Sequence, residues 1–147
     1  MMQDAIIREV TVKASSERVY KVMTDPAEIV KWFPDSVEEG TLEVGQEPFF
    51  AFKEYGVRQR ILVVAANPFD YFAFRWAPGL EGSQELTVTD LPNTLVEFLI
   101  EAQGETTKVT IKESGFASLP SGYAAKSHEE NSDGWEYMAD RLEKLLS

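Results

Sequence analysis

The sequence predicts an α+β protein in which an antiparallel sheet faces one amphipathic helix near the end of the chain. Two observations predict this class. From about residue 36 to 114, Gly, Pro and Asn turn signals separate segments rich in Val, Ile, Phe and Thr, as in an antiparallel meander. Beyond about residue 120, apolar residues recur at steps of three and four, as in an amphipathic helix. The 147 residues are expected to form a single domain, 1–147.

One strand and two short helices are expected before the meander. Residues 6–14 alternate between apolar and polar positions, with Arg8 as the exception, and they are rich in β-branched residues, so they predict a strand. Ser15 is suited to cap a helix over about 16–23. Asp25 is suited to cap a second, shorter helix that continues through the aromatic residues before Pro34.

Strands of the meander are expected to have a dry and a wet face, because successive side chains of a strand point to opposite sides. Glu113 shares the parity of the apolar residues in the last of these strands, so its carboxylate is expected to point inward. The apolar positions are Phe72, Phe74 and Trp76 in one segment, Val96, Phe98 and Ile100 in another, and Val109 and Ile111 in a third.

Two further segments complete the expected fold. Residues 85–89 are a candidate short strand with no assigned place in the sheet. The terminal helix is expected to break or kink near Gly134, because glycine costs about 1 kcal/mol relative to alanine inside a helix. The apolar stripe of that helix consists of Trp135, Met138, Ala139, Leu142, Leu145 and Leu146.

Composition excludes several classes of function. The formal charge of −11, from 25 acidic and 14 basic residues, disfavours nucleic acid and anionic lipid surfaces as partners. The chain has no cysteine and one histidine, which excludes thiolate zinc sites, cysteine nucleophiles and most multi-histidine metal sites. No phosphate-binding, dinucleotide-binding or hydrolase motif is present, so no cofactor, metal or catalytic residue is predicted.

The expected location is the cytoplasm. Residues 1–11 contain charged side chains and lack the apolar core of a signal peptide. The longest apolar run, 61–66, is too short to span a membrane.

The order of elements and several short motifs resemble a known fold family. One strand, two short helices, a long meander and a terminal helix are the order of the helix-grip, START-like fold. The chain resembles the SRPBCC superfamily and, within it, bacterial proteins similar to the C-terminal domain of the activator of heat-shock protein 90 ATPase. The motifs that carry the resemblance are Val19-Tyr20, Asp25-Pro26, Lys31-Trp32-Phe33, Phe74-Arg75-Trp76, Thr94-Leu95-Val96-Glu97-Phe98, Glu113-Ser114-Gly115-Phe116, and Gly134-Trp135 with Leu142.

The resemblance implies a curved antiparallel sheet wrapped around the terminal helix, with an apolar cavity between them that binds a hydrophobic molecule in many superfamily members. Inward aromatic side chains facing one helix also favour leftover space, although the same residues can simply form a packed core. The residues expected at the cavity are Trp32, Phe33, Phe72, Phe74, Trp76, Phe98, Glu113, Trp135 and Met138.

Glu113 is the candidate polar group of this cavity, because a buried carboxylate requires a partner. Arg58, Arg60 and Arg75 are the candidate partners and polar anchors, since a guanidinium group binds carboxylates and phosphates well. Such a pair would either hold a polar group of a ligand or satisfy one end of the cavity. Arg58 and Arg60 can alternatively form a solvated face.

Three functions remain open from the sequence. The first is non-catalytic binding of a small hydrophobic or amphipathic molecule. The second, implied by the resemblance, is modulation of a heat-shock protein 90 ATPase, although no stretch resembles the stimulatory Trp- and His-containing motif of that activator's other domain. The third is a cyclase- or aromatase-like enzyme, which requires an ionisable side chain in the cavity. Glu113 is the residue to test for the third.

Overall fold

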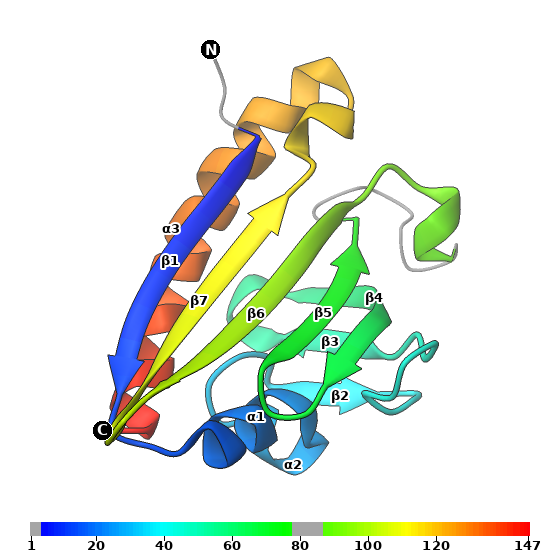
Figure 1. Ribbon diagram of the computed structural model, residues 1–147. Helices are drawn as coiled ribbons and strands as arrows, with labels where there is room; N and C mark the ends of the chain where they lie inside the picture. Colours follow the sequence, from blue (N-terminus) through cyan, green and yellow to red (C-terminus); the bar gives the residue numbers. More distant parts are fainter. Residues whose placement is uncertain (1–3, 78–86) are drawn as a thin grey trace.

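The computed structural model describes residues 4–77 and 87–147, and in these ranges it has one seven-stranded sheet in which all neighbouring strands are antiparallel. A long helix, α3 (Ser121–Leu145), lies along the face of the sheet beside its first strand (Figure 1). The α+β class is therefore confirmed. In sheet order the strands are β1 (Ala5–Val12), β7 (Thr106–Ser114), β6 (Thr94–Gln103), β5 (Tyr71–Trp76), β4 (Val57–Asn67), β3 (Phe49–Phe52) and β2 (Ser36–Glu38).

Both expected helix caps are present after β1. The side chain of Ser15 accepts a hydrogen bond of 3.1 Å from the amide of Arg18 and caps α1 (Ser16–Thr24). The side chain of Asp25 accepts one of 2.9 Å from the amide of Ala27 and caps α2 (Pro26–Ile29). Both helices lie at one end of the sheet (Figure 1).

The second helix is shorter than expected and ends at Ile29, ahead of the aromatic pair. The amide of Trp32 bonds to the carbonyl of Ile29 in a tighter, three-residue turn. The Trp32 indole nitrogen donates to the carbonyl of Val22 at 2.7 Å, which fixes this turn against α1. Phe33 is thereby placed in a turn that faces the interior of the sheet, and is 3% exposed.

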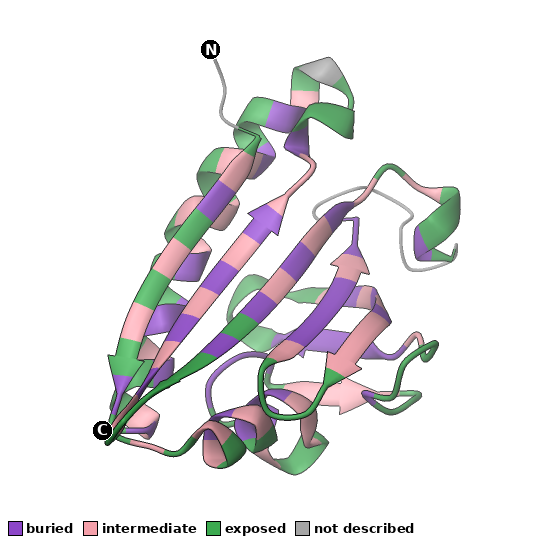
Figure 2. Ribbon diagram, viewed as in Figure 1, coloured by how far each residue is buried: buried purple, intermediate pink, exposed green. Residues whose placement is uncertain are grey.

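The inner face of the sheet is apolar, as strand alternation predicts. Burial alternates along β6 and β7 (Figure 2), and Phe98 and Ile111 are fully or almost fully buried. Arg8, the charged residue among the apolar positions of β1, connects the strand to the helix. Arg8 reaches α3 and donates to the carbonyl and the hydroxyl oxygen of Ser132 at 3.1 and 2.8 Å.

Two local expectations were wrong. Val88–Asp90 forms a 3-10 turn instead of part of a strand, while residues 85 and 86 lie outside the described residues. The helix α3 continues through Gly134 without a break. The apolar stripe that follows Gly134 is buried, with Trp135 at 2% and Leu142 at 0% exposed. This packing outweighs the cost of about 1 kcal/mol for glycine inside a helix.

No helix in the described parts of the chain is both long and apolar enough to cross a membrane.

Candidate functional site

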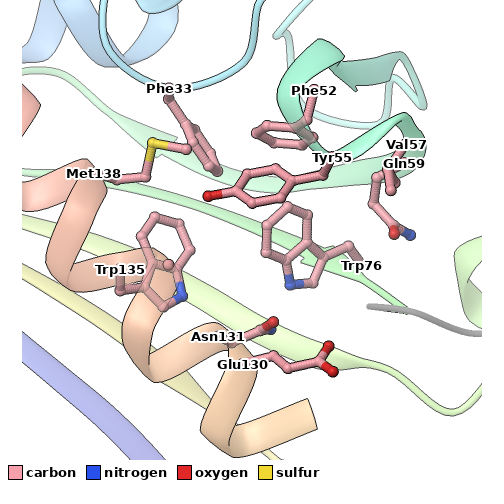
Figure 3. A pocket seen from close by; sticks show the side chains of 11 residues that line it. Phe33, Phe52, Tyr55, Val57, Gln59, Trp76, Glu130, Asn131, Trp135 and Met138 are labelled. Carbon is pink, nitrogen blue, oxygen red and sulfur yellow. The ribbon is translucent and has the colours of Figure 1, made fainter.

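A cavity of about 240 Å³ lies between α3 and the half of the sheet formed by β3, β4 and β5. Trp135 and Met138 reach it from α3, whereas Phe33 and Phe52 close it from the opposite side (Figure 3). The lining residues are Phe33, Phe52, Tyr55, Val57, Gln59, Trp76, Glu130, Asn131, Gly134, Trp135 and Met138.

Three aromatic rings form the apolar wall of the cavity. The ring centroid of Phe33 lies 5.0 Å from that of Trp135 and 5.9 Å from that of Trp76. The two indole rings lie 6.0 Å apart with an angle of 34° between their planes. These separations are typical of favourable aromatic pairs, so the wall is ordered by contacts among its own members.

The cavity opens to solvent beside Tyr55 and Val57, which are 55% and 40% exposed. Tyr55 ends a short 3-10 turn, η1 (Lys53–Tyr55), between β3 and β4. Gly56 follows with a φ of 63°, a left-handed conformation that glycine adopts at little cost. This turn places the Tyr55 ring over the cavity, opposite the two tryptophans (Figure 3).

Glu113 is fully buried directly behind the cavity wall. The indole nitrogen of Trp135 donates to its Oε1 at 2.7 Å, and that of Trp76 donates to its Oε2 at 2.9 Å. The hydroxyl of Thr94 donates to Oε2 at 2.5 Å, and Nδ2 of Asn131 lies 3.0 and 3.1 Å from the two oxygens. All four partners are donors, which matches the acceptor-only form of a carboxylate.

This carboxylate links the sheet to the helix and orients both indoles. Trp76 lies on β5, Glu113 on β7 and Trp135 on α3, so one side chain fixes three elements that are distant in sequence. Because each indole nitrogen points at Glu113, the remaining edges and faces of the rings are free to line the cavity. We call Glu113 and its four donors the carboxylate clamp.

The candidate arginine anchors lie elsewhere. Arg58 forms ion pairs with Glu38 and Glu39 at 2.9 and 2.6 Å. The guanidinium of Arg60 lies 4.3 Å from the ring centroid of Phe49. Arg75 donates to Oδ1 of Asn93 at 3.1 Å.

Strand alternation explains why these arginines do not meet Glu113. In β4 the inward positions belong to Gln59, Ile61 and Val63, so the residues on either side of Gln59 point to the other face. Arg75 likewise stands between two inward aromatic residues of β5. No arginine or lysine in the described ranges forms an ion pair with Glu113.

The other candidate residues fall into two groups. Phe33, Trp76, Trp135 and Met138 line the cavity. Four aromatic residues are fully buried at 0% exposure and belong to the packed core without bordering the cavity. These core residues are Trp32, Phe72, Phe74 and Phe98.

Several lining residues were not selected from the sequence. Asn131 lies one helical turn before Trp135, and this spacing of four places both side chains on one face of α3. Gln59 has the inward parity of its strand, although its two arginine neighbours conceal that pattern. Tyr55 had no sequence signal, because a turn between strands positions it.

The chemistry of the site is that of a binding pocket with few free polar groups. Within residues 4–77 and 87–147, no cluster of three or more His, Asp or Glu side chains is placed to hold a metal ion. The most buried acid, Glu113, is fully engaged by its donors. The ionisable groups that line the cavity, Tyr55 and Glu130, are exposed to solvent.

Comparison with known proteins identifies relatives of the chain. A family model described as "Activator of Hsp90 ATPase homolog 1-like protein" matches residues 13–147. No curated protein matches.

Solved structures share the fold at low sequence identity. DynU16, from the dynemicin biosynthetic locus, is 23% identical with a TM-score of 0.76, and the match covers 99% of this chain and 48% of DynU16. The chain thus spans about half of that protein. MLL2253 from Mesorhizobium loti is 18% identical with a TM-score of 0.74, covering 97% and 96% of the two chains. The Aha1 dimer from Colwellia psychrerythraea is 20% identical with a TM-score of 0.72, covering 97% and 95%. These likenesses establish the helix-grip fold.

Proposed function

The chain belongs to the Activator of Hsp90 ATPase homolog 1-like family, and from this we propose that it binds a small, largely apolar molecule between the sheet and α3 without transforming it. The observation that supports this proposal most directly is the cavity of about 240 Å³ with walls formed by Phe33, Trp76 and Trp135. Concave sites with mostly apolar linings and a few placed polar groups are typical of ligand binding.

The size of the cavity limits the ligand. An apolar cavity of about 150 Å³ holds benzene, whereas sites for drug-sized molecules measure about 300–1,000 Å³. A volume of about 240 Å³ therefore favours a body of about two fused rings. The opening beside Tyr55 leaves room for a substituent that extends toward solvent.

The carboxylate clamp supports binding over catalysis. A general acid or base must reach the reacting group within hydrogen-bond distance. Both oxygens of Glu113 already accept hydrogen bonds from protein donors, and Trp76, Trp135 and Asn131 stand between it and the cavity. A cyclase-like role for Glu113 would require these hydrogen bonds to break.

The three tryptophans provide an internal control for a binding test. Trp76 and Trp135 line the cavity, while Trp32 is fully buried and donates to a backbone carbonyl outside it. With 1-ethylnaphthalene as the probe, we expect the indole N–H resonances of Trp76 and Trp135 to shift and that of Trp32 to stay nearly fixed. Equal or absent shifts of all three would contradict binding in the cavity.

Two glycines of α3 allow a matched pair of variants. Gly134 lines the cavity and Gly122 does not, and beyond the backbone of the helix itself a Cβ at either position meets no heavy atom within 4 Å. We expect Gly134→Leu to fill the cavity and abolish the probe-induced shifts, and Gly122→Leu to retain them. Unchanged binding by a folded Gly134→Leu variant would place the ligand elsewhere.

The family match favours a second candidate, the modulation of an Hsp90 ATPase. A coupled assay with the chaperone from the same source tests it. Stimulated ATP turnover that saturates with added protein would support this function, and an unchanged rate at saturating protein would remove it.

A further inference from the structure

We propose that the ligand of this cavity carries a cationic amine, so that the preferred class is a two-ring apolar molecule with an ammonium group. This inference rests on the proposed function and specifies its ligand. It follows from the polar groups that remain available at the end of the cavity formed by Glu130 and Asn131, which we call the acceptor end (Figure 3).

The strongest donors of the cavity wall are already used. The indole nitrogens of Trp76 and Trp135 and Nδ2 of Asn131 all donate to Glu113. The hydroxyl of Tyr55 remains, but it lies across the cavity near Met138, away from the acceptor end (Figure 3). A ligand carboxylate would therefore lose water at the acceptor end without gaining a donor there.

Two amide oxygens of the lining residues lack a described partner: that of Asn131, at the acceptor end, and that of Gln59, which lies beyond Trp76 (Figure 3). Gln59 is 5% exposed, and its Nε2 donates to the carbonyl of Ala77 at 3.1 Å, which fixes the orientation of the amide. Its Oε1 has no hydrogen-bond partner among the described residues. Asn131 is oriented in the same way by Glu113, and its Oδ1 also lacks a described partner. Amide oxygens that border a cavity without protein partners call for a donor from the ligand.

The charge at the acceptor end is negative. Glu130 lines the cavity, and the buried carboxylate of Glu113 has no cationic partner in the parts of the chain described. No lysine or arginine is among the lining residues. Lys126 approaches Glu130 at 3.8 Å, but their side chains are 75% and 63% exposed, so this pair is weak and easily displaced.

The aromatic wall favours the same class of ligand. Indole rings attract cations held over their faces, and the attraction grows when the cation is shielded from water. Trp76 and Trp135 provide such faces next to the acceptor end.

Three probes with the same naphthalene body test the charge preference. They are the amine 2-(1-naphthyl)ethylamine, the alcohol 2-(1-naphthyl)ethanol and the carboxylate 1-naphthaleneacetate, called the acetate below. Their dissociation constants are measured by calorimetry at neutral pH in about 0.15 M salt, where long-range attraction to the acidic protein is screened. The indole resonances of Trp76 and Trp135 report whether each probe enters the cavity. We expect the amine to bind about tenfold or more tightly than the acetate, with the alcohol between them.

A matched pair of variants tests the role of Glu130. We expect Glu130→Gln to weaken amine binding by about two- to fivefold, as for an exposed ion pair, and to leave alcohol binding unchanged. Glu129→Gln removes the same charge from the neighbouring exposed position, which does not line the cavity, and should leave both affinities unchanged.

The outcomes separate the two proposals. Acetate binding as tight as amine binding, or an equal loss of amine affinity in the two glutamine variants, would overturn the cationic class while leaving binding in the cavity intact. If no probe, including the uncharged 1-ethylnaphthalene, moves the two indole resonances, the proposed function fails together with this inference.

Discussion

Replacing Glu113 by glutamine tests the carboxylate clamp with almost no change of shape. Whichever way the new amide turns, its NH₂ group faces the indole nitrogen of either Trp76 or Trp135. Two donors then oppose each other in a fully buried site. Thr94 and Asn131 can adapt by rotating, but an indole N–H cannot become an acceptor.

The expected cost follows from the hydrogen bonds that the substitution removes or weakens. One orphaned buried donor costs about 1–3 kcal/mol, and the surviving bonds lose the extra strength of a charged acceptor, so the total is about 2–4 kcal/mol. Removing the charge also relieves its desolvation, which acts in the opposite direction. Because four donors surround the carboxylate, we expect the loss of hydrogen bonding to dominate.

Urea unfolding followed by tryptophan fluorescence measures this difference. A loss of about 2–4 kcal/mol corresponds to a melting temperature lower by about 5–15 °C, and a domain with the usual stability of about 5–15 kcal/mol would still fold. The matched control is Glu101→Gln, because Glu101 is an exposed strand residue whose side chain makes no hydrogen bond within the described ranges. That variant should stay within about 0.5 kcal/mol of the parent.

A Glu113→Gln protein as stable as the parent would refute this reasoning. It would mean that desolvation of the buried charge offsets its hydrogen bonds and that the clamp contributes no net stability. An equal loss in Glu101→Gln would show that the effect belongs to net charge and not to the clamp.

Three further predictions concern other positions. Gly134→Ala should raise the free energy of unfolding by about 0.5–1 kcal/mol in urea titrations, because a helical glycine is costly and its added Cβ meets nothing within 4 Å; no gain would contradict this. Burial and then the hydrogen bond to Glu97 raise the pKa of Tyr71 from 10.0 to about 12, so stability should fall as pH rises from 10 to 12. NMR of the folded protein should find the ring titrating near 12, and titration near 10.0 would contradict the shift. Hydrogen bonds, first that from Lys31 and then that from Arg18, lower the pKa of Glu28 from 4.5 to about 2. The parent should therefore be more stable than Glu28→Gln above pH 4.5, and this difference should vanish as pH falls through 2. Titration of the Glu28 carboxyl near 4.5 in NMR would refute the shift.

Local patterns predicted much of the fold. Alternation along β7 placed Glu113 on the inner face beside Ile111, and that position is confirmed. Capping chemistry located the starts of α1 and α2 at Ser15 and Asp25. The end of α2 was mispredicted, because beyond Ile29 the backbone makes three-residue turns, from Lys31 to Glu28 and from Trp32 to Ile29, instead of continuing the α-helix.

The partners of Glu113 could not be predicted in the same way. Trp76, Thr94 and Asn131 reach it from β5, β6 and α3, with separations of 37, 19 and 18 residues along the chain. A single sequence shows which side chains of a strand share a face. It does not show which inward residues of different strands and of the helix come into contact. The arginine pairing was expected because it satisfies charge, whereas the structure satisfies the carboxylate with neutral donors.

By itself, the sequence determined the order of the elements and the face on which each apolar or polar side chain lies, because these follow from local periodicity of 2 or 3.6 residues. Only the tertiary structure decided which aromatic residues fill the core and which border the cavity. An empty space is the volume that packed elements leave between them, so it depends on their mutual placement. Phe98 and Trp76 have the same inward parity on neighbouring strands, yet one is enclosed by rings and the other lines the cavity at the helix.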